Sequence, residues 1–276
     1  MPVKSYSFKS SDISFEVPRI MGIVNVTPDS FSDGGKYNSV NSAVDHALKL
    51  IDEGAEIIDI GGESSRPGSD PVSPEDEILR TVPVIKKLRE INKNIIISID
   101  TTKNEVAREA LDNGADIIND ISGLTFDNRM IEVAKIFNAG VVIMHMQGNP
   151  KTMQLNPEYK DVVEEVKQFL IRQSAYAETN GVNKIIIDPG IGFGKTVENN
   201  FDLIRKLNVF REIGYPVMIG VSRKSFIGKT LNLETEERDI PTSILESIAV
   251  INSARLIRTH NVKYCSQMVK LVKHLI

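Results

Sequence analysis

The chain has 276 residues, of which 41% are hydrophobic and 25% are charged, as expected for an ordinary soluble protein. Its formal net charge of −4 argues against nucleic acid as the main partner. No apolar segment approaches the roughly 20 residues that span a bilayer, and the first residues do not resemble a secretory signal. The single cysteine, Cys265, excludes an internal disulfide and a multi-cysteine metal cluster. We therefore expect a cytoplasmic protein that binds neither membranes nor nucleic acid.

Eight short apolar segments follow one another from residue 20 to the end of the chain, and polar residues close each of them. These residues are, in order, Asn25, Asp59, Asp100, Asn119, His145, Asp188, the segment Ser222–Lys224, and the pair Arg258 and His260. Between consecutive segments there is enough chain for a helix, a repeat typical of parallel strands joined by crossover helices. One (β/α)8 barrel takes about 250 residues. We therefore predict a single TIM barrel over residues 20–276, preceded by an extension, residues 1–19, that forms a β-hairpin over the bottom of the barrel.

The helices between these strands can be recognised from the spacing of their apolar residues. The clearest sets are Val44, Ala47, Leu48 and Ile51, ended by Gly54; Val162, Val166, Phe169 and Leu170, ended before Gly181; and Met268, Leu271, Val272 and Leu275. We expect the last set to pack against the barrel. Pro83 lies inside a fourth helical pattern and should kink that helix or mark its first turn.

Two connections are much longer than the two to six residues usual between a strand and the next helix. They are NVTPDSFSDGGKYNS, from Asn25, and GGESSRPGSDPVSPEDE, from Gly61, and both are rich in Gly, Pro, Ser and Asp. They could be tolerated surface insertions. Because both follow the carboxyl ends of strands, where such barrels carry out their chemistry, we expect them to be lids or substrate clamps.

Three aspartates, Asp59, Asp100 and Asp188, close apolar segments. A single aspartate in such a place can simply accept backbone N–H bonds, and we expect that structural role for Asp59. Asp100 and Asp188 together with Asn119 could instead bind a ligand. A carboxylate presents two acceptors to adjacent N–H donors, and an amide adds a donor and an acceptor beside them. The set suits a flat heterocycle with a guanidine-like edge, such as a pterin or a purine.

A cationic group closes the last two segments. SRKSFIG places Arg223, Lys224 and Ser225 where a short helix can begin, and Arg258 and His260 alternate along the eighth strand, so both side chains point the same way. Barrels commonly bind anions at these loops, although a solvated charge pair is the alternative. The two Gly-Lys-Thr tripeptides nearby lack the preceding glycine of a P-loop, which argues against a kinase or an ATPase.

Signatures of a resident metal or a nucleophile are weak. The histidines, His46, His145, His260 and His274, have no metal-ligand spacing to one another, and His145 is better explained as a packed residue. The one metal we expect is Mg²⁺ bridging substrate phosphates, with Asn25 as its candidate protein ligand. Cys265 should be a buried small hydrophobe in the last helix. No Ser-His-Asp or Cys-His grouping suggests covalent catalysis.

Eight motifs, in this order, resemble those of the dihydropteroate synthase family, the sulfonamide target of folate biosynthesis. They are NVTPDSFSDGG, GGESSRPG, SIDTTK, NDISG, MHMQGNPKTMQ, DPGIGFGK, GVSRKSFIG and RTHNV, and the resemblance covers the chain from Ile20 on. It implies a TIM barrel, usually a homodimer, that joins 6-hydroxymethyl-7,8-dihydropterin pyrophosphate to p-aminobenzoate. Pyrophosphate leaves with the help of Mg²⁺, and the arylamine attacks a cation at the pterin methylene.

The resemblance also implies which residues form the site. Pterin would be bound by Asp100, Asn119, Met144, Asp188, Phe193, Lys224 and Arg258. p-Aminobenzoate would be bound by Phe31, Ser65, Pro67, Phe193, Lys224 and Ser225. Pyrophosphate would be bound by Asn25, Arg258 and His260, with Asn25 as the metal ligand. Lys224, Arg258 and Asp100 would be the catalytic residues. No strong general base is needed, because an arylamine is already nucleophilic near neutral pH.

Two positions depart from the family pattern. Ser65 stands where ESTRPG has threonine, so we expect an altered affinity for p-aminobenzoate or sulfonamides with the chemistry retained. Asn261 replaces the usual aspartate of the last motif, and we expect a lost helix-capping charge or weaker support of the site rather than lost activity. Two alternatives remain. One is a pterin-binding paralogue without synthase activity, and the other is a pterin-dependent methyltransferase domain, which would have no reason to carry NVTPDSFSDGG or SRKS.

Overall fold

The computed structural model describes residues 3–26, 35–64 and 68–275. Within these ranges a two-stranded antiparallel hairpin precedes eight parallel strands. The hairpin consists of β1 (Ser5–Ser7) and β2 (Asp12–Ser14). The parallel strands are β3 (Arg19–Asn25), β4 (Ile57–Gly61), β5 (Ile96–Asp100), β6 (Ile117–Asp120), β7 (Gly140–Met144), β8 (Ile185–Asp188), β9 (Met218–Ile219) and β10 (Leu256–Thr259).

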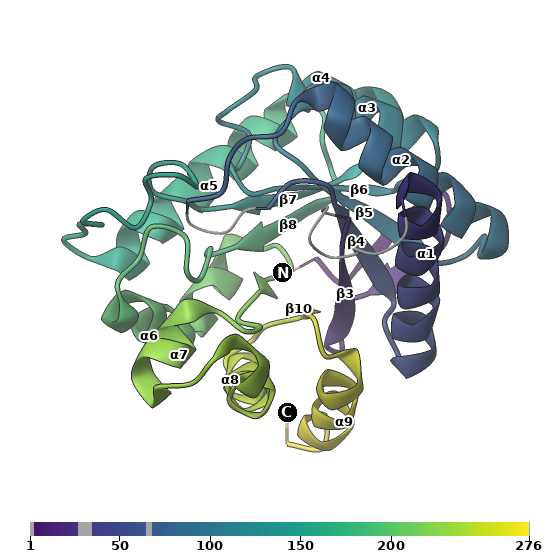
Figure 1. Cartoon of the computed structure of the whole chain (residues 1–276). Coiled ribbons are helices and arrows are strands. Elements are labelled where there is room, and N and C mark those ends of the chain that lie inside the picture. Colours follow the sequence, from purple (N-terminus) through teal and green to yellow (C-terminus); the bar gives the residue numbers. More distant parts are fainter. Residues whose placement is uncertain (1–2, 27–34, 65–67, 276) are drawn as a thin grey trace.

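Helices follow the parallel strands and form an outer layer around them (Figure 1). They are α1 (Gly35–Glu53), α2 (Pro74–Ile91), α3 (Asn104–Asp112), α4 (Met130–Phe137), α5 (Val162–Thr179), α6 (Val197–Arg205), α7 (Ser225–Leu231), α8 (Asp239–Ile251) and α9 (Val262–Val272). Two short 3₁₀ helices, η2 (Leu207–Ile213) and η3 (Thr235–Glu237), lie in the connections before β9 and α8. This alternation is what the repeated apolar segments predict.

The eight strands close almost completely into a barrel. Their order is β8-β7-β6-β5-β4-β3-β10-β9, so the last strands return beside the first. Ile257 of β10 lies opposite Ile20 of β3, and a parallel bridge joins Ile187 of β8 to Val217, the residue before β9. The predicted (β/α)8 TIM barrel is therefore confirmed.

The hairpin packs under the barrel as predicted. Tyr6, Ile13 and Phe15 are buried and form one apolar cluster with residues from the interior of the barrel: Met21, Ile57, Ile96, Ile117, Val142, Ile186, Met218 and Leu256. The rings of Tyr6 and Phe15 meet edge to face with centroids 5.6 Å apart. The Tyr6 hydroxyl donates to the Ile185 carbonyl at 2.5 Å, which ties the hairpin to β8.

Most of the helix predictions are confirmed, and one is partly wrong. Gly54 follows the last residue of α1 with φ +113°, and α5 ends before Gly181. In α9, however, Leu271 is 71% exposed, because the buried face runs through Val262, Cys265, Met268 and Val272. Leu275, beyond the end of the helix, is 75% exposed as well.

Two further expectations concern α2 and the cysteine. Pro83 lies in the interior of α2, nine residues after its first residue, Pro74, so it does not mark the first turn. Cys265 is unpaired and fully buried in α9, as predicted. In the described part of the chain, none of the helices combines the length and apolarity that a membrane crossing requires.

Candidate active site

The carboxyl ends of the strands bring the predicted polar residues together at one end of the barrel. Asp100, the last residue of β5, lies opposite Asn119 of β6. Met144, the last residue of β7, lies opposite Asp188, the last residue of β8. Parallel strands of a barrel end at the same rim, and this rim is where such barrels place their chemistry. The strand register alone therefore places four of the predicted pterin residues on two pairs of neighbouring strands.

Arg258 of β10 joins two carboxylates across the mouth of the barrel. Its Nε donates to Asp59 Oδ2 at 2.6 Å, and its Nη2 donates to Asp100 Oδ2 at 2.7 Å. The Arg258 side chain is 19% exposed, and Asp59 is fully buried. Charge-assisted bonds in such a desolvated place are strong and fix the position of the guanidinium.

Asp59 supports two of the predicted site residues. Besides Arg258, it accepts a hydrogen bond from Asn119 Nδ2 at 3.0 Å through the same oxygen, Oδ2. Asp59 Oδ1 and Asn119 Oδ1 are buried and have no hydrogen-bond partner among the described residues. Leaving a buried acceptor without a donor costs free energy. The floor of the mouth therefore contains acceptors that N–H groups of a ligand could satisfy.

The environment raises the pKa of both predicted pterin aspartates. Burial raises the pKa of the Asp100 carboxyl to about 7, although the positive charge of Arg258 opposes the shift. Burial also raises the pKa of Asp188, opposed by Lys224 and by the N–H of Gly190, which donates to Asp188 Oδ1 at 2.7 Å. In both cases the ionised form lacks water and gains from any donor that a ligand brings.

Lys224 precedes α7 and points toward the loop after β8. Its Nζ donates to the Ile191 carbonyl and lies 4.3 Å from the centroid of the Phe193 ring, a cation–π contact. Burial lowers the pKa of the Lys224 ammonium to about 7, Asp188 opposes this shift, and Arg258 adds to it. Lys224 therefore lies over an aromatic ring at the rim of the barrel, near enough to Asp188 for that carboxylate to favour its charged form.

An apolar patch lies beside these charges. Met144 and Phe193, both predicted, form a cluster with Ile121 and Met153, against which Met146 packs. Ile121 and Met153 were not predicted, because both lie in loops where apolar periodicity gives no signal. Their positions within the NDISG and MHMQGNPKTMQ motifs could have indicated them.

The expectation that Arg223 belongs to the cationic group of the site is wrong. Its Nε and Nη2 donate to the two carboxylate oxygens of Asp239 at 2.6 and 2.9 Å, which commits the guanidinium to the start of α8. His260 remains at the end of the eighth strand, where its Nδ1 lies 3.0 Å from the Ser222 hydroxyl. His145 is buried and edge-on to Phe169, as expected of a packed residue.

The remaining predicted residues fall into two groups. Asn25 is half-buried at the end of β3, and Ser225 is exposed as the first residue of α7. Phe31, Ser65 and Pro67 lie outside the described residues. In the described ranges there is no group of three or more His, Cys, Asp or Glu side chains that could hold a metal ion.

Comparisons with known proteins agree with the motifs. The model of a family described as Pterin binding enzyme matches residues 21–260. The dihydropteroate synthase of Synechocystis sp. is 46% identical over 255 residues, which cover 91% of this chain and 88% of that protein. The dihydropteroate synthase of Escherichia coli is 43% identical over 267 residues, 96% of this chain and 94% of that protein. This chain belongs to the dihydropteroate synthase family.

The likeness to this family extends to the three-dimensional structure. The solved structure of Xanthomonas albilineans dihydropteroate synthase with 4-aminobenzoic acid superposes with a TM-score of 0.90 at 39% identity, covering 96% of this chain and 95% of that one. As a member of the dihydropteroate synthases, the chain is a transferase of folate biosynthesis.

Asn261, where the family usually has aspartate, still caps a helix. Its side-chain oxygen accepts from the backbone N–H of Tyr264 at 3.1 Å at the start of α9, and its Nδ2 donates to Asp239 Oδ2 at 2.8 Å. The capping bond therefore survives without the charge. The amide also supports Asp239, the partner of Arg223, which a carboxylate in this place could not do.

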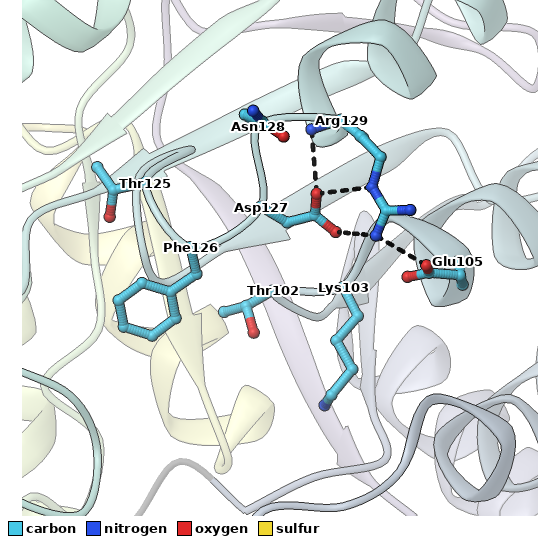
Figure 2. A pocket seen from close by; sticks show the side chains of 8 residues that line it. All are labelled: Thr102, Lys103, Glu105, Thr125, Phe126, Asp127, Asn128 and Arg129. Atoms are coloured by element: carbon cyan, nitrogen blue, oxygen red, sulfur yellow. Dashed lines mark hydrogen bonds and ion pairs between the residues drawn. The ribbon is translucent and has the colours of Figure 1, made fainter.

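A pocket of about 600 Å³ lies over the loops after β5 and β6 (Figure 2). It is lined by Thr102, Lys103, Glu105, Thr125, Phe126, Asp127, Asn128 and Arg129. Arg129 pairs with Asp127 and Glu105 within the pocket, whereas Lys103 bonds outside it to Glu63 and Glu77. None of the residues that the family resemblance implies lines this pocket.

Proposed function

We propose that the residues at the mouth of the barrel catalyse the dihydropteroate synthase reaction. In this reaction 6-hydroxymethyl-7,8-dihydropterin pyrophosphate and p-aminobenzoate give 7,8-dihydropteroate and pyrophosphate. The observation that carries the assignment of residues is the array of desolvated acceptors at the ends of β5, β6 and β8, with Arg258 crossing it. It combines acceptors for a heterocycle edge with cations for a leaving anion.

The pterin would be recognised by Asp100, Asn119 and Asp188. The edge of a pterin presents adjacent N–H donors, which match the carboxylate oxygens of an aspartate. No described residue donates to Asp100 Oδ1, and the Asn119 Oδ1 acceptor is buried without a partner in the described part of the chain. The face of the ring would lie against the apolar cluster of Met144 and Phe193.

Pyrophosphate would be held by Arg258, His260 and Asn25, which lie at the ends of two adjacent strands, β10 and β3. Asn25 offers one carboxamide oxygen, which fits a Mg²⁺ ion that keeps its remaining ligands from water and phosphate oxygens. When bound, Mg²⁺ would neutralise the negative charge of the leaving group. Arg258 would add a second cation on the protein side.

p-Aminobenzoate would be placed by Lys224, Ser225 and Phe193, together with Phe31, Ser65 and Pro67 of the two long loops. Lys224 already lies over the Phe193 ring, and its position beside the exposed Ser225 suits a carboxylate-bearing aromatic ring. The family resemblance assigns the loop residues to p-aminobenzoate.

The reaction needs the carbon–oxygen bond between the pterin methylene and pyrophosphate to break, with the electron pair leaving on oxygen. The arylamine nitrogen then forms the new bond to the methylene and loses a proton. Cations that stabilise the departing pyrophosphate supply the main electrostatic contribution. Alignment of the two substrates supplies much of the rest. Lys224, Arg258 and Asp100 are the catalytic residues in this proposal.

The catalytic assignment is tested by turnover. Purified protein would be given the pterin pyrophosphate, p-aminobenzoate and Mg²⁺, and dihydropteroate and released pyrophosphate would be measured. Tight pterin binding without turnover would favour a pterin-binding paralogue. Methyl transfer with a corrinoid protein in place of condensation would favour the methyltransferase alternative.

The division of the site is tested by a pair of variants. Asp188→Asn should abolish pterin affinity, whereas Ser65→Ala should mainly raise the KM for p-aminobenzoate, because the two side chains are assigned to different substrates. Isothermal calorimetry and steady-state kinetics would measure these effects. Equal losses of pterin affinity in both variants would contradict the division.

A homodimer is proposed from the surface of α8. Ile240, Ile244, Ile248 and Ile251 are each more than 40% exposed and recur every three or four residues, so they form an apolar stripe. A stripe of this kind on a folded protein suits a second copy of the chain. Ile244→Lys should convert the dimer into monomers in sedimentation experiments.

A cytoplasmic location is proposed from the single cysteine.

A further inference from the structure

Lys195 is a buried lysine beneath the mouth of the barrel, to which the reaction assigns no role. It is only 3% exposed. Its Nζ donates to the Phe193 carbonyl at 2.9 Å and to the His145 carbonyl at 3.3 Å, and it lies 3.0 Å from His145 Nδ1. A fully buried lysine is rare unless its polar head is paired, and here three partners surround it.

These contacts join two loops that both reach the pterin residues. His145 follows β7 directly after Met144, and Phe193 belongs to the loop after β8. The loops approach so closely that a Cβ added at Gly190 would lie 1.9 Å from the His145 carbonyl oxygen. A Cβ at Gly194 would lie 2.4 Å from the carbonyl oxygen of Gln147. The backbones of the β7 and β8 loops are therefore in close contact, and the hydrogen bonds of Lys195 join the two loops.

The same β8 loop carries the groups that face the substrates. Asp188 begins it, and the Ile191 carbonyl and the Phe193 ring hold the Lys224 ammonium. A displacement of this loop would therefore move the cation and its partners together. Misplacing reacting groups by about 1 Å can cost on the order of a hundredfold in rate.

We propose that Lys195 is a positioning residue: by bonding the Phe193 and His145 carbonyls, it holds the β8 loop where Asp188 and Lys224 meet the pterin substrate. It touches no substrate itself. The inference rests on the proposed function. The inference gives a role to Lys195, the lysine of the DPGIGFGK motif. In a nucleotide-binding loop this lysine would instead have bound phosphate.

The test compares two variants that each remove a hydrogen bond from this loop. Lys195→Met keeps an unbranched side chain, one atom shorter than lysine, but removes every donor. Tyr159→Phe is the matched control, because the Tyr159 hydroxyl donates to the Gly194 carbonyl at 2.8 Å without bonding to His145 or Phe193. We expect Lys195→Met to raise the KM and the calorimetric Kd for the pterin pyrophosphate by about tenfold or more. The KM for p-aminobenzoate should change less than twofold, and the control should resemble the native enzyme.

A pH profile separates positioning from a general loss of stability. Lys224 is faced by Asp188, Asp100, Arg258 and, across the loop, Lys195, and burial is the main cause of its lowered pKa. Loosening the β8 loop would let more water reach the half-buried Lys224, so the alkaline limb of kcat/KM should move to higher pH in Lys195→Met. Loss of stability alone would leave the midpoint of this limb in place.

Each outcome decides the inference. Should Lys195→Met fail to fold, Lys195→Gln, which keeps an N–H donor on a shorter side chain, takes its place and should show a smaller loss of pterin affinity. Native pterin affinity and an unmoved alkaline limb in the folded variant would overturn the inference. Equal losses in Tyr159→Phe would overturn it as well. Absence of turnover in the native protein would instead refute the proposed function, and the calorimetric comparison would still judge Lys195.

Discussion

The bottom of the barrel is closed by apolar contacts, whereas its mouth is crossed by charges. At the bottom, Tyr6 and Phe15 pack on the interior ends of the strands, and the Tyr6 hydroxyl both donates to the Ile185 carbonyl and accepts from the Ile185 N–H. At the mouth, Arg258 lies between Asp59 and Asp100. Apolar side chains therefore fill the bottom of the barrel, whereas ion pairs cross its mouth.

The difference extends to the buried polar groups at the two ends of the barrel. At the bottom, the buried hydroxyl of Tyr6 has its partners within the chain, so changes there should cost stability alone. At the mouth, Asp59 Oδ1 and Asn119 Oδ1 are buried without a described partner. Buried acceptors of this kind cost stability in the free protein and gain a donor when a ligand binds. Changes at the mouth should therefore alter activity and stability together.

Removing Arg258 should produce the largest effect. Arg258→Met leaves two buried carboxylates without their cation, which should cost about 3–5 kcal/mol of unfolding free energy. Synthase activity should fall below detection, because pterin and pyrophosphate both lose the same partner. Denaturant unfolding and turnover assays measure the two effects. Arg258→Met combined with Asp59→Asn should regain part of the stability but none of the activity, and a single variant as stable as the native protein would contradict the role of the ion pairs.

The pH dependence of the mouth comes next in size. Asp100 gains a proton as the pH falls through about 7, and Lys224 loses one as the pH rises through about 7. The free enzyme therefore holds both charges best near neutrality. The kcat/KM for the pterin pyrophosphate should fall on both sides, approaching about tenfold per pH unit. Lys224→Arg stays charged at high pH and should lose the alkaline limb. An unchanged bell-shaped pH profile of kcat/KM in this variant would show that another group causes that limb.

The same shift of Asp100 predicts how stability varies with pH in the substrate-free protein. Its pKa is raised in the folded state from 3.8 to about 7. Its contribution to stability is therefore complete below pH 3.8 and is lost as the pH rises through 7. Asp100→Asn should remove this part of the decline between pH 4 and 7, which thermal unfolding across that range would measure.

The sequence predicts the barrel and the ring of residues at its mouth because both follow from strand periodicity. Asp100, Asn119 and Asp188 close apolar segments, and closing a parallel strand places a residue at the rim. The N-terminal hairpin was equally predictable from the SYSF and ISFEV segments on either side of Ser10–Asp12. These features need only local pattern and the rule that parallel strands end at one edge.

Partners that are chosen by tertiary contacts could not be predicted in this way. Arg223 adjoins Lys224 in the sequence, yet it bonds to Asp239 at the start of α8. The sequence around Lys195 shows only a motif that lacks the P-loop pattern. Nothing in it reveals that His145 of the β7 loop supplies one of the acceptors of Lys195, beside the Phe193 carbonyl of its own loop. The exposure of Leu271 was missed because the width of a buried helix face depends on what it packs against.

At the bottom of the barrel, Tyr6→Phe should sharpen the comparison. The variant loses a hydroxyl that makes two hydrogen bonds with Ile185 and leaves a buried carbonyl without its donor. We expect a loss of about 1–2 kcal/mol in unfolding free energy. The kcat and both KM values should stay as in the native enzyme, since no site residue touches this hydroxyl. A clear fall in kcat would show that the two ends are coupled.

Asn261→Asp should give the smallest effect, because it changes two opposing contributions at the edge of the mouth. A carboxylate would strengthen the cap of α9 through the helix dipole, by about 0.3–1 kcal/mol. It would also replace the donor to Asp239 by a like charge, although Arg223, which bonds to both carboxylate oxygens of Asp239, would absorb part of the repulsion. We expect a net change in unfolding free energy below about 1 kcal/mol and unchanged pterin affinity. A much larger loss, or an altered pterin Kd, would mean that the Arg223–Asp239–Asn261 group belongs to the functional mouth rather than to its support.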